Sequence, residues 1–125
     1  MEFRTPSYFA LAALLDGPLH GYAIVRRAEE LSGGTVHLSA GTLHALLDRA
    51  LREDLVIAGE PYVESGRPRR DYTLTPAGRD ALGAEAERLA QAAETVTRRL
   101  RDSARGQTLP SGTDSSNPGR VAPAW

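Results

Sequence analysis

The chain has 125 residues, 41% of them hydrophobic and 25% charged, which suits one ordinary globular domain. Its 15 basic residues, all arginine, nearly balance 16 acidic ones, so a surface that binds a polyanion must concentrate positive charge locally. The sequence has no cysteine and no apolar run near the roughly 18 residues of a membrane span, so we expect a cytoplasmic protein without disulfides, a signal peptide or a membrane partner.

Two short helices are predicted in the first third of the chain. Thr5 is the expected N-cap of the first helix, with Pro6 as its first helical residue, and Asp-Gly-Pro at residues 16–18 ends it. The second helix is predicted over residues 20–31, before Ser-Gly-Gly. Its apolar face is expected to comprise Ile24, Ala28 and Leu31.

A third helix is predicted to begin at Ser39, which is a good N-cap residue. The small residues of its first turn would let the backbone approach a DNA duplex closely, in the way that the second helix of a helix-turn-helix does. An ordinary capped amphipathic helix would have the same pattern, so this helix alone does not decide between the two. Its expected buried stripe is Leu43, Leu46, Leu47 and Ala50. Its candidate DNA contacts are Ser39, Gly41, Thr42, His44 and Arg49.

A β-hairpin is predicted after the third helix, from two extended runs at residues 56–64 and 71–74. The link between them, residues 65–70, carries three arginines, and we expect these to point into solvent. Such a tip suits a DNA backbone or a narrow minor groove, although a solvated charged turn would look alike. The three arginines are Arg67, Arg69 and Arg70.

A long helix is predicted to begin at Thr75 and Pro76 and to run to about Arg101. Apolar residues recur along it at steps of 4, 3, 4, 3 and 4, which is a heptad seam. A domain of this size lacks the core to bury that seam, so pairing with a second copy is expected; packing onto the chain's own helices is the alternative. The seam comprises Leu82, Ala86, Leu89, Ala93, Val96 and Leu100.

Together these elements predict an α+β, mainly helical fold. Residues 3–75 would form a winged helix-turn-helix with a two-stranded β wing, and residues 76–102 a long C-terminal dimerisation helix. Residues 103–125 are rich in Ser, Gly and Pro and poor in apolar residues, so we predict a disordered tail there.

Four stretches resemble the PadR family of bacterial transcriptional regulators, specifically the type with a short C-terminal region. They are residues 14–22 (LLDGPLHGY), 39–43 (SAGTL), 55–56 (LV) and 66–79 (GRPRRDYTLTPAGR). The resemblance implies a homodimeric winged-helix DNA-binding protein, usually a repressor, that dimerises through its last helix. By position, it places DNA contacts at Tyr22, Ser39, Gly41, Thr42, residue 44, Arg67, Arg69 and Arg70.

The chain departs from the family pattern at several positions. His44 stands where the family usually has tyrosine, and Ala50 reduces the volume of the expected core. Asp54 stands at a usual glycine, and it adopts positive φ more easily than most residues. No aromatic residue lies between residues 76 and 101, so the aromatic drug pocket of some relatives has no counterpart on this helix.

We therefore predict a sequence-specific, dimeric DNA-binding regulator that reads a palindromic operator and responds to a small ligand or another signal. The alternative is a winged-helix module that binds another protein. We expect no enzyme, cofactor or metal, because no hydrolase, phosphate-loop or metalloprotease motif occurs. His20 is expected to make a structural hydrogen bond, and His37 and His44 lack further ligands for a metal site.

Overall fold

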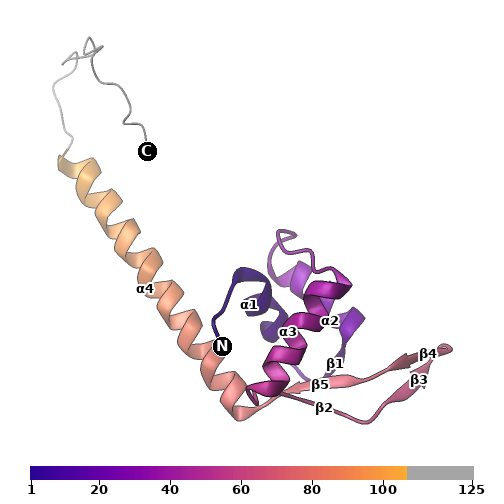
Figure 1. The fold of residues 1–125 in the computed structure, drawn as a ribbon. Helices are drawn as coiled ribbons and strands as arrows, with labels where there is room; N and C mark the ends of the chain where they lie inside the picture. Colours follow the sequence, from indigo (N-terminus) through magenta and orange to yellow (C-terminus); the bar gives the residue numbers. More distant parts are fainter. Residues whose placement is uncertain (107–125) are drawn as a thin grey trace. The chain divides into compact units, whose positions relative to one another are not determined.

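The computed structural model describes residues 1–106, and the predicted order of three helices, a hairpin and a long helix is confirmed (Figure 1). The strands form a three-stranded antiparallel sheet in the order β1-β5-β2 and a separate hairpin of β3 and β4. The helices are α1 (Thr5–Ala12), α2 (Gly21–Leu31), α3 (Ala40–Arg52) and α4 (Pro76–Gly106). The strands are β1 (Leu19–His20), β2 (Val56–Ala58), β3 (Tyr62–Glu64), β4 (Arg67–Arg69) and β5 (Asp71–Leu74).

Two of the three predicted N-caps are confirmed. Ser39 Oγ accepts a hydrogen bond from the Thr42 N–H at 3.1 Å, and Thr75 Oγ1 accepts one from the Gly78 N–H at 2.9 Å. The prediction for Thr5 is wrong, because Thr5 is already helical and Arg4 occupies the cap position of α1. A proline in the first turn needs no capping side chain to start a helix, since its missing N–H would have no intrahelical partner there.

The core lies between α1, α2, α3 and the three-stranded sheet, and Leu11, Ile24 and Val56 are its largest fully buried side chains. All four residues of the predicted α3 stripe are buried. On α2 the prediction holds for Ile24 and Ala28 but is wrong for Leu31, which is 40% exposed in the last turn of the helix. The apolar periodicity therefore predicts the buried faces correctly, except in the last turn of α2, which extends beyond the elements that it packs against.

The hairpin differs from its prediction in two ways. The extended run at residues 56–64 divides into β2 and β3, and the turn consists of Ser65 and Gly66 alone, with φ of +51° and +77°. Positive φ at both positions is typical of a type I′ two-residue hairpin loop, and Gly66 adopts it without strain. The segment Arg67–Arg69 is consequently strand β4, paired with β3, and not part of an open tip. Figure 1 shows this hairpin, the wing, leading away from α1, α2 and α3.

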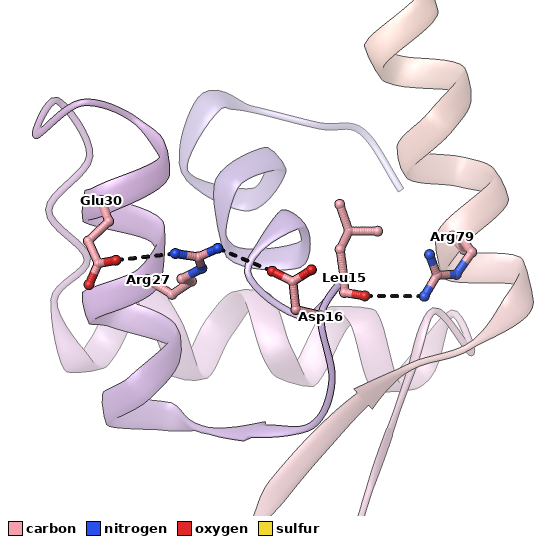
Figure 2. Close-up of polar contacts among 5 residues, drawn as sticks. All are labelled: Leu15, Asp16, Arg27, Glu30 and Arg79. Carbon is pink, nitrogen blue, oxygen red and sulfur yellow. Dashed lines mark hydrogen bonds and ion pairs between the residues drawn. The ribbon is translucent and has the colours of Figure 1, made fainter.

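Arginines fix the turn that follows α1 (Figure 2). Arg27 of α2 binds Asp16 at 3.1 Å and Glu30 at 3.2 Å, and both partners raise the pKa of its guanidinium. Arg79, in the first turns of α4, donates to the Leu15 carbonyl oxygen at 3.4 Å. This turn leads into the two-residue strand β1, which pairs with β5 and which the sequence prediction missed.

The chain divides into two compact units, and the first, Met1–Leu89, includes the beginning of α4. The helix continues to Gly106, so the predicted end near residue 101 is too early, and residues 103–106 of the predicted tail are helical. The remainder of the predicted disordered tail, residues 107–125, lies outside the described residues. Within residues 1–106, no helix is both long enough and apolar enough to cross a membrane.

Candidate nucleic-acid interface

The first turn of α3 is exposed and is organised by its own side chains. The Ser39 hydroxyl donates to Thr42 Oγ1 at 3.0 Å while it accepts the Thr42 N–H, so both residues are fixed at the start of the helix. Gly41 is exposed, and a Cβ there would meet no described atom within 4 Å. Packing within the chain therefore does not require this glycine, although glycine costs a helix about 1 kcal/mol relative to alanine.

Predicted contact residues from three elements surround one groove. Tyr22 of α2, His44 of α3 and Arg70, which links β4 to β5, line a cavity of about 450 Å³. Tyr22 is 61% exposed, and the Arg26 guanidinium lies 5.9 Å from the centre of its ring. Sequence analysis missed Arg26; its place one helical turn after Tyr22 is the signal that could have indicated it.

The three arginines of the wing do not behave alike. Arg67 and Arg70 are exposed, as predicted, whereas the side chain of Arg69 is only 19% exposed. Arg69 Nη1 lies 3.2 Å from His20 Nδ1, and its Nε lies 3.6 Å from Glu64 Oε1. The prediction that all three point into solvent is therefore wrong for Arg69. Arg69 lies at the end of the hairpin that is opposite the turn, where its side chain reaches α2.

Arg49 is placed in the last turns of α3, far along the helix from Ser39. Its Nε donates to Glu53 Oε2 at 3.3 Å, and Glu53 Oε1 lies 2.5 Å from the Met1 amino group. The amino group first, and Arg49 second, lower the pKa of Glu53. Arg49 is one of the DNA contacts predicted from the sequence, and in the structure its guanidinium pairs with Glu53.

The heptad seam of α4 changes character along its length. Leu82 is buried and Ala86 half-buried against the first compact unit. Leu89 is already 40% exposed, and Val96 and Leu100 are 58% and 65% exposed within this chain. Within the first compact unit, the alternative of packing onto the chain's own helices therefore holds for the first two seam positions.

An aromatic cluster that sequence analysis missed lies beside the start of α4. The rings of Phe3, Tyr8 and Phe9 meet edge to face, with centroids 6.5 Å apart for the first pair and 5.3 Å for the second. With Leu89 and Arg88 they line a cavity of about 390 Å³. Because these aromatic residues come from the first ten residues of the sequence, the lack of aromatic residues on the long helix gave no sign of them. Among residues 1–106, no three acidic or histidine side chains group closely enough to hold a metal ion.

Comparison with known proteins identifies the family. The family model described as the transcriptional regulator PadR-like family matches residues 10–84, which is more than half of the chain. This chain belongs to the PadR-like family. The match covers α2, α3, both parts of the sheet and the start of α4, so it includes every element that surrounds the groove. The resemblance inferred from the four motifs is confirmed.

Two curated proteins and one solved structure place the PadR-like chain more closely. It is 44% identical over 91 residues to an uncharacterized 37.1 kDa protein in transposon TN4556 of Streptomyces fradiae, matching 73% of this chain but only 25% of that relative's length. It is 38% identical over 81 residues to the transcriptional regulator Rv3488 of Mycobacterium tuberculosis, over 65% of this chain and 72% of the relative. Bacillus subtilis PadR, solved in complex with operator DNA, shares the fold at 23% identity with a TM-score of 0.58, over 66% of this chain and 48% of that one.

The motif residues of this PadR-like chain have local structural roles. His20 caps α2, since its Nδ1 accepts the Ala23 N–H at 3.2 Å, which confirms the predicted structural hydrogen bond. Gly21 lets α2 approach α3, because a Cβ there would lie 3.1 Å from the Leu43 side chain. Asp54 has a φ of +58°, as expected at a position where the family has glycine.

Proposed function

We propose that this PadR-like chain is a sequence-specific DNA-binding transcription regulator. In this proposal α3 enters the major groove with its exposed first turn against base edges, while Arg67 and Arg70 of the wing region contact the DNA backbone. One observation carries the proposal: Tyr22 on α2, His44 on α3 and Arg70 between β4 and β5 line a single groove. The solved complex of Bacillus subtilis PadR with operator DNA supports it. Since chromosomal DNA is the target, we propose that the protein acts in the cytoplasm.

We further propose a homodimer that reads a palindromic operator, with its recognition helices about 34 Å apart. The exposed seam residues from Leu89 to Leu100 support a second copy as the partner of α4, because apolar side chains at heptad spacing gain most from another helix. A repressor role rests on the family resemblance. A ligand response is supported by the cavity beside Phe3, Tyr8 and Phe9, which has the size and aromatic lining of a small-molecule site.

The alternative function, a module that binds another protein, is favoured by the near-neutral charge and by the same exposed seam. The two proposals differ in what the wing does. A protein-binding module needs no arginine beside the groove, whereas a DNA-binding one loses affinity when Arg67 or Arg70 is removed.

The test is a shift assay with the intergenic DNA upstream of the protein's own gene. We expect a complex that resists competitor DNA and whose affinity falls about 10³-fold to 10⁵-fold between 50 and 200 mM salt, if about six to ten phosphates are contacted. Arg67→Ala and Arg70→Ala should each weaken binding to all sequences alike and lower the salt slope by about one. Arg98→Ala, which removes the same charge from α4, is the matched control. Unchanged affinity in the Arg67→Ala/Arg70→Ala double variant would exclude the wing as a contact surface.

A further inference from the structure

The wing is weakly attached to the rest of the first compact unit. Strands β3 and β4 pair only with each other, and the ladder between β2 and β5 ends with the Gly59 N–H donating to the Asp71 carbonyl oxygen at 2.8 Å. A two-stranded hairpin by itself is marginally stable in water. Among residues 1–106, two polar contacts tie its side chains to other elements: Tyr62 Oη donates to Asp71 Oδ1 at 2.7 Å, and Arg69 reaches His20.

The guanidinium of Arg69 makes its contacts with other residues of the same chain. Its Nη1 points to His20 at the start of α2, its Nε lies 3.6 Å from Glu64 Oε1, and this Nε is buried without a hydrogen-bond partner among the described residues. An arginine that contacts phosphate or a base edge must present its N–H groups outward. Arg67, two residues earlier on the same strand, is exposed and meets that requirement.

The contact fixes the protonation of His20. His20 Nδ1 lies 3.2 Å from two donors, the Ala23 N–H and Arg69 Nη1. A backbone N–H and a guanidinium can only donate, so Nδ1 must be an acceptor and the ring proton must be on Nε2. One lone pair therefore serves both the cap of α2 and the attachment of the wing.

We infer that Arg69 is a positioning residue, which holds the wing against α2 through His20 and does so only while His20 is neutral. A proton on Nδ1 removes the acceptor from both donors at once. It also places a positive charge beside Arg69 and at the N-terminus of α2, where cations are disfavoured. Nearby carboxylates attract a His20 imidazolium. This attraction cannot restore the hydrogen bond from the Arg69 guanidinium, because the protonated Nδ1 no longer accepts. The titratable and charged groups that line a cavity together with His20, or pair with it across the sheet, are Arg26, Arg27 and Glu30 on α2, His44 on α3, Glu64 on β3, Arg69 on β4, Arg70 between β4 and β5, and Asp71 on β5.

The first test measures wing attachment without DNA. Amide hydrogen exchange by NMR on the full chain, expressed as protection factors, should show roughly threefold to tenfold lower protection of β3 and β4 in Arg69→Ala, because a hydrogen bond from a charged donor is lost. Arg67→Ala is the matched control and should leave these amides unchanged. Amides of α3 report whether the variant is otherwise folded. Protection of the wing in Arg69→Ala equal to that of the unmodified protein would overturn the inference.

The second test uses pH, to which a merely structural side chain would not respond. As the nitrogen chemical shifts of His20 report its change from the Nε2–H form to the imidazolium, wing protection should fall to the level of Arg69→Ala. In His20→Asn the amide oxygen accepts both donors at every pH, and asparagine is a good N-cap, so wing protection should stay constant. Wing protection in the unmodified protein that is unchanged after His20 has become protonated would refute the inference. If Arg69→Ala does not fold, His20→Asn still tests the inference.

That Arg69 positions a DNA-contacting wing, and does not contact DNA itself, rests on the proposed function, but neither measurement of wing protection uses DNA. A chain that binds no duplex, yet loses wing protection as described, would refute the proposed function and leave the role of Arg69 intact. Conversely, a chain that binds DNA and keeps its wing protection in Arg69→Ala would retain the proposed function and return Arg69 to the contact residues.

Discussion

Helix α3 and the wing are held by different kinds of interaction, although both surround the same groove. Helix α3 buries four apolar side chains and has a capped start, so its position follows from the core. No residue of β3 or β4 is fully buried, and polar contacts of Tyr62 and Arg69 connect the hairpin to neighbouring elements. One side of the groove, α3, is therefore held by the core, whereas the other side, the wing, is held by polar contacts. Solution conditions can change the wing side while the fold stays intact.

The largest effect should come from destabilising the body, by which we mean the first compact unit, Met1–Leu89, without the wing. A Cβ on Gly78 would clash with the Leu55 carbonyl oxygen, where α4 starts against the segment that links α3 to β2. Backbone cannot move aside as a flexible side chain does, so Gly78→Ala should lower the free energy of unfolding by more than about 2 kcal/mol. Chemical denaturation followed by circular dichroism measures this change.

Gly83→Ala is the control for that substitution. Gly83 lies one and a half turns later on α4, and a Cβ there would meet no described atom within 4 Å. Removing a glycine from an open helical position should raise stability by up to about 1 kcal/mol. Equal changes in the free energy of unfolding for Gly78→Ala and Gly83→Ala would contradict the close backbone approach at Gly78. The stability of both the body and the wing would then have to be explained by side-chain contacts alone.

The same contrast explains what the sequence could and could not predict. The buried stripe of α3 and the cap at Ser39 follow from local periodicity and residue chemistry, and both are confirmed. The orientation of Arg69 depends on His20, which lies 49 residues away, and no local pattern carries that information. The wing turn was predicted too long because three arginines and a proline suggested a loop, whereas Ser65 and Gly66 alone supply the positive φ values.

An intermediate effect is expected at the C-terminal end of α3. The Met1 amino group, and then Arg49, lower the pKa of Glu53 below its ordinary value of 4.5. A carboxylate with a lowered folded pKa stabilises the fold above its unfolded pKa, and this contribution disappears as the pH falls through the folded value. Glu53→Gln should therefore be less stable than the unmodified protein at pH 7, and the difference should narrow below the unfolded pKa and close as the pH falls through the folded pKa.

Urea denaturation at a series of pH values measures that difference. Asp48→Asn removes a carboxylate from the same helix and is the matched control. A stability difference for Glu53→Gln that persists when the carboxylate is fully protonated would mean that side-chain packing, and not the charge of Glu53, is responsible. Because this contact belongs to the body, the protection of β3 and β4 relative to that of α3 should not change.

The smallest effect on overall stability should come from the second attachment of the wing. Tyr62 donates to Asp71, which raises the pKa of the Tyr62 hydroxyl, and Tyr62 stands opposite Arg69 in the hairpin. Tyr62→Phe removes this bond and should change the free energy of unfolding by less than about 0.5 kcal/mol, because the hairpin opens before the body unfolds. Amide protection of β3 and β4 should nevertheless fall, as in Arg69→Ala.

Combining the two substitutions sharpens the comparison between wing and body. If Tyr62 and Arg69 attach the hairpin independently, the two substitutions should have multiplicative effects on wing protection. If the hairpin needs both contacts at once, either substitution alone should produce most of the loss of protection. Tyr72→Phe, the same chemical change on β5, is the control and should leave the wing as it is. Loss of α3 protection in Tyr62→Phe would contradict the division into a wing held by polar contacts and a body held by its core, since opening of the hairpin alone leaves Leu46 and Ala50 of α3 packed in the core.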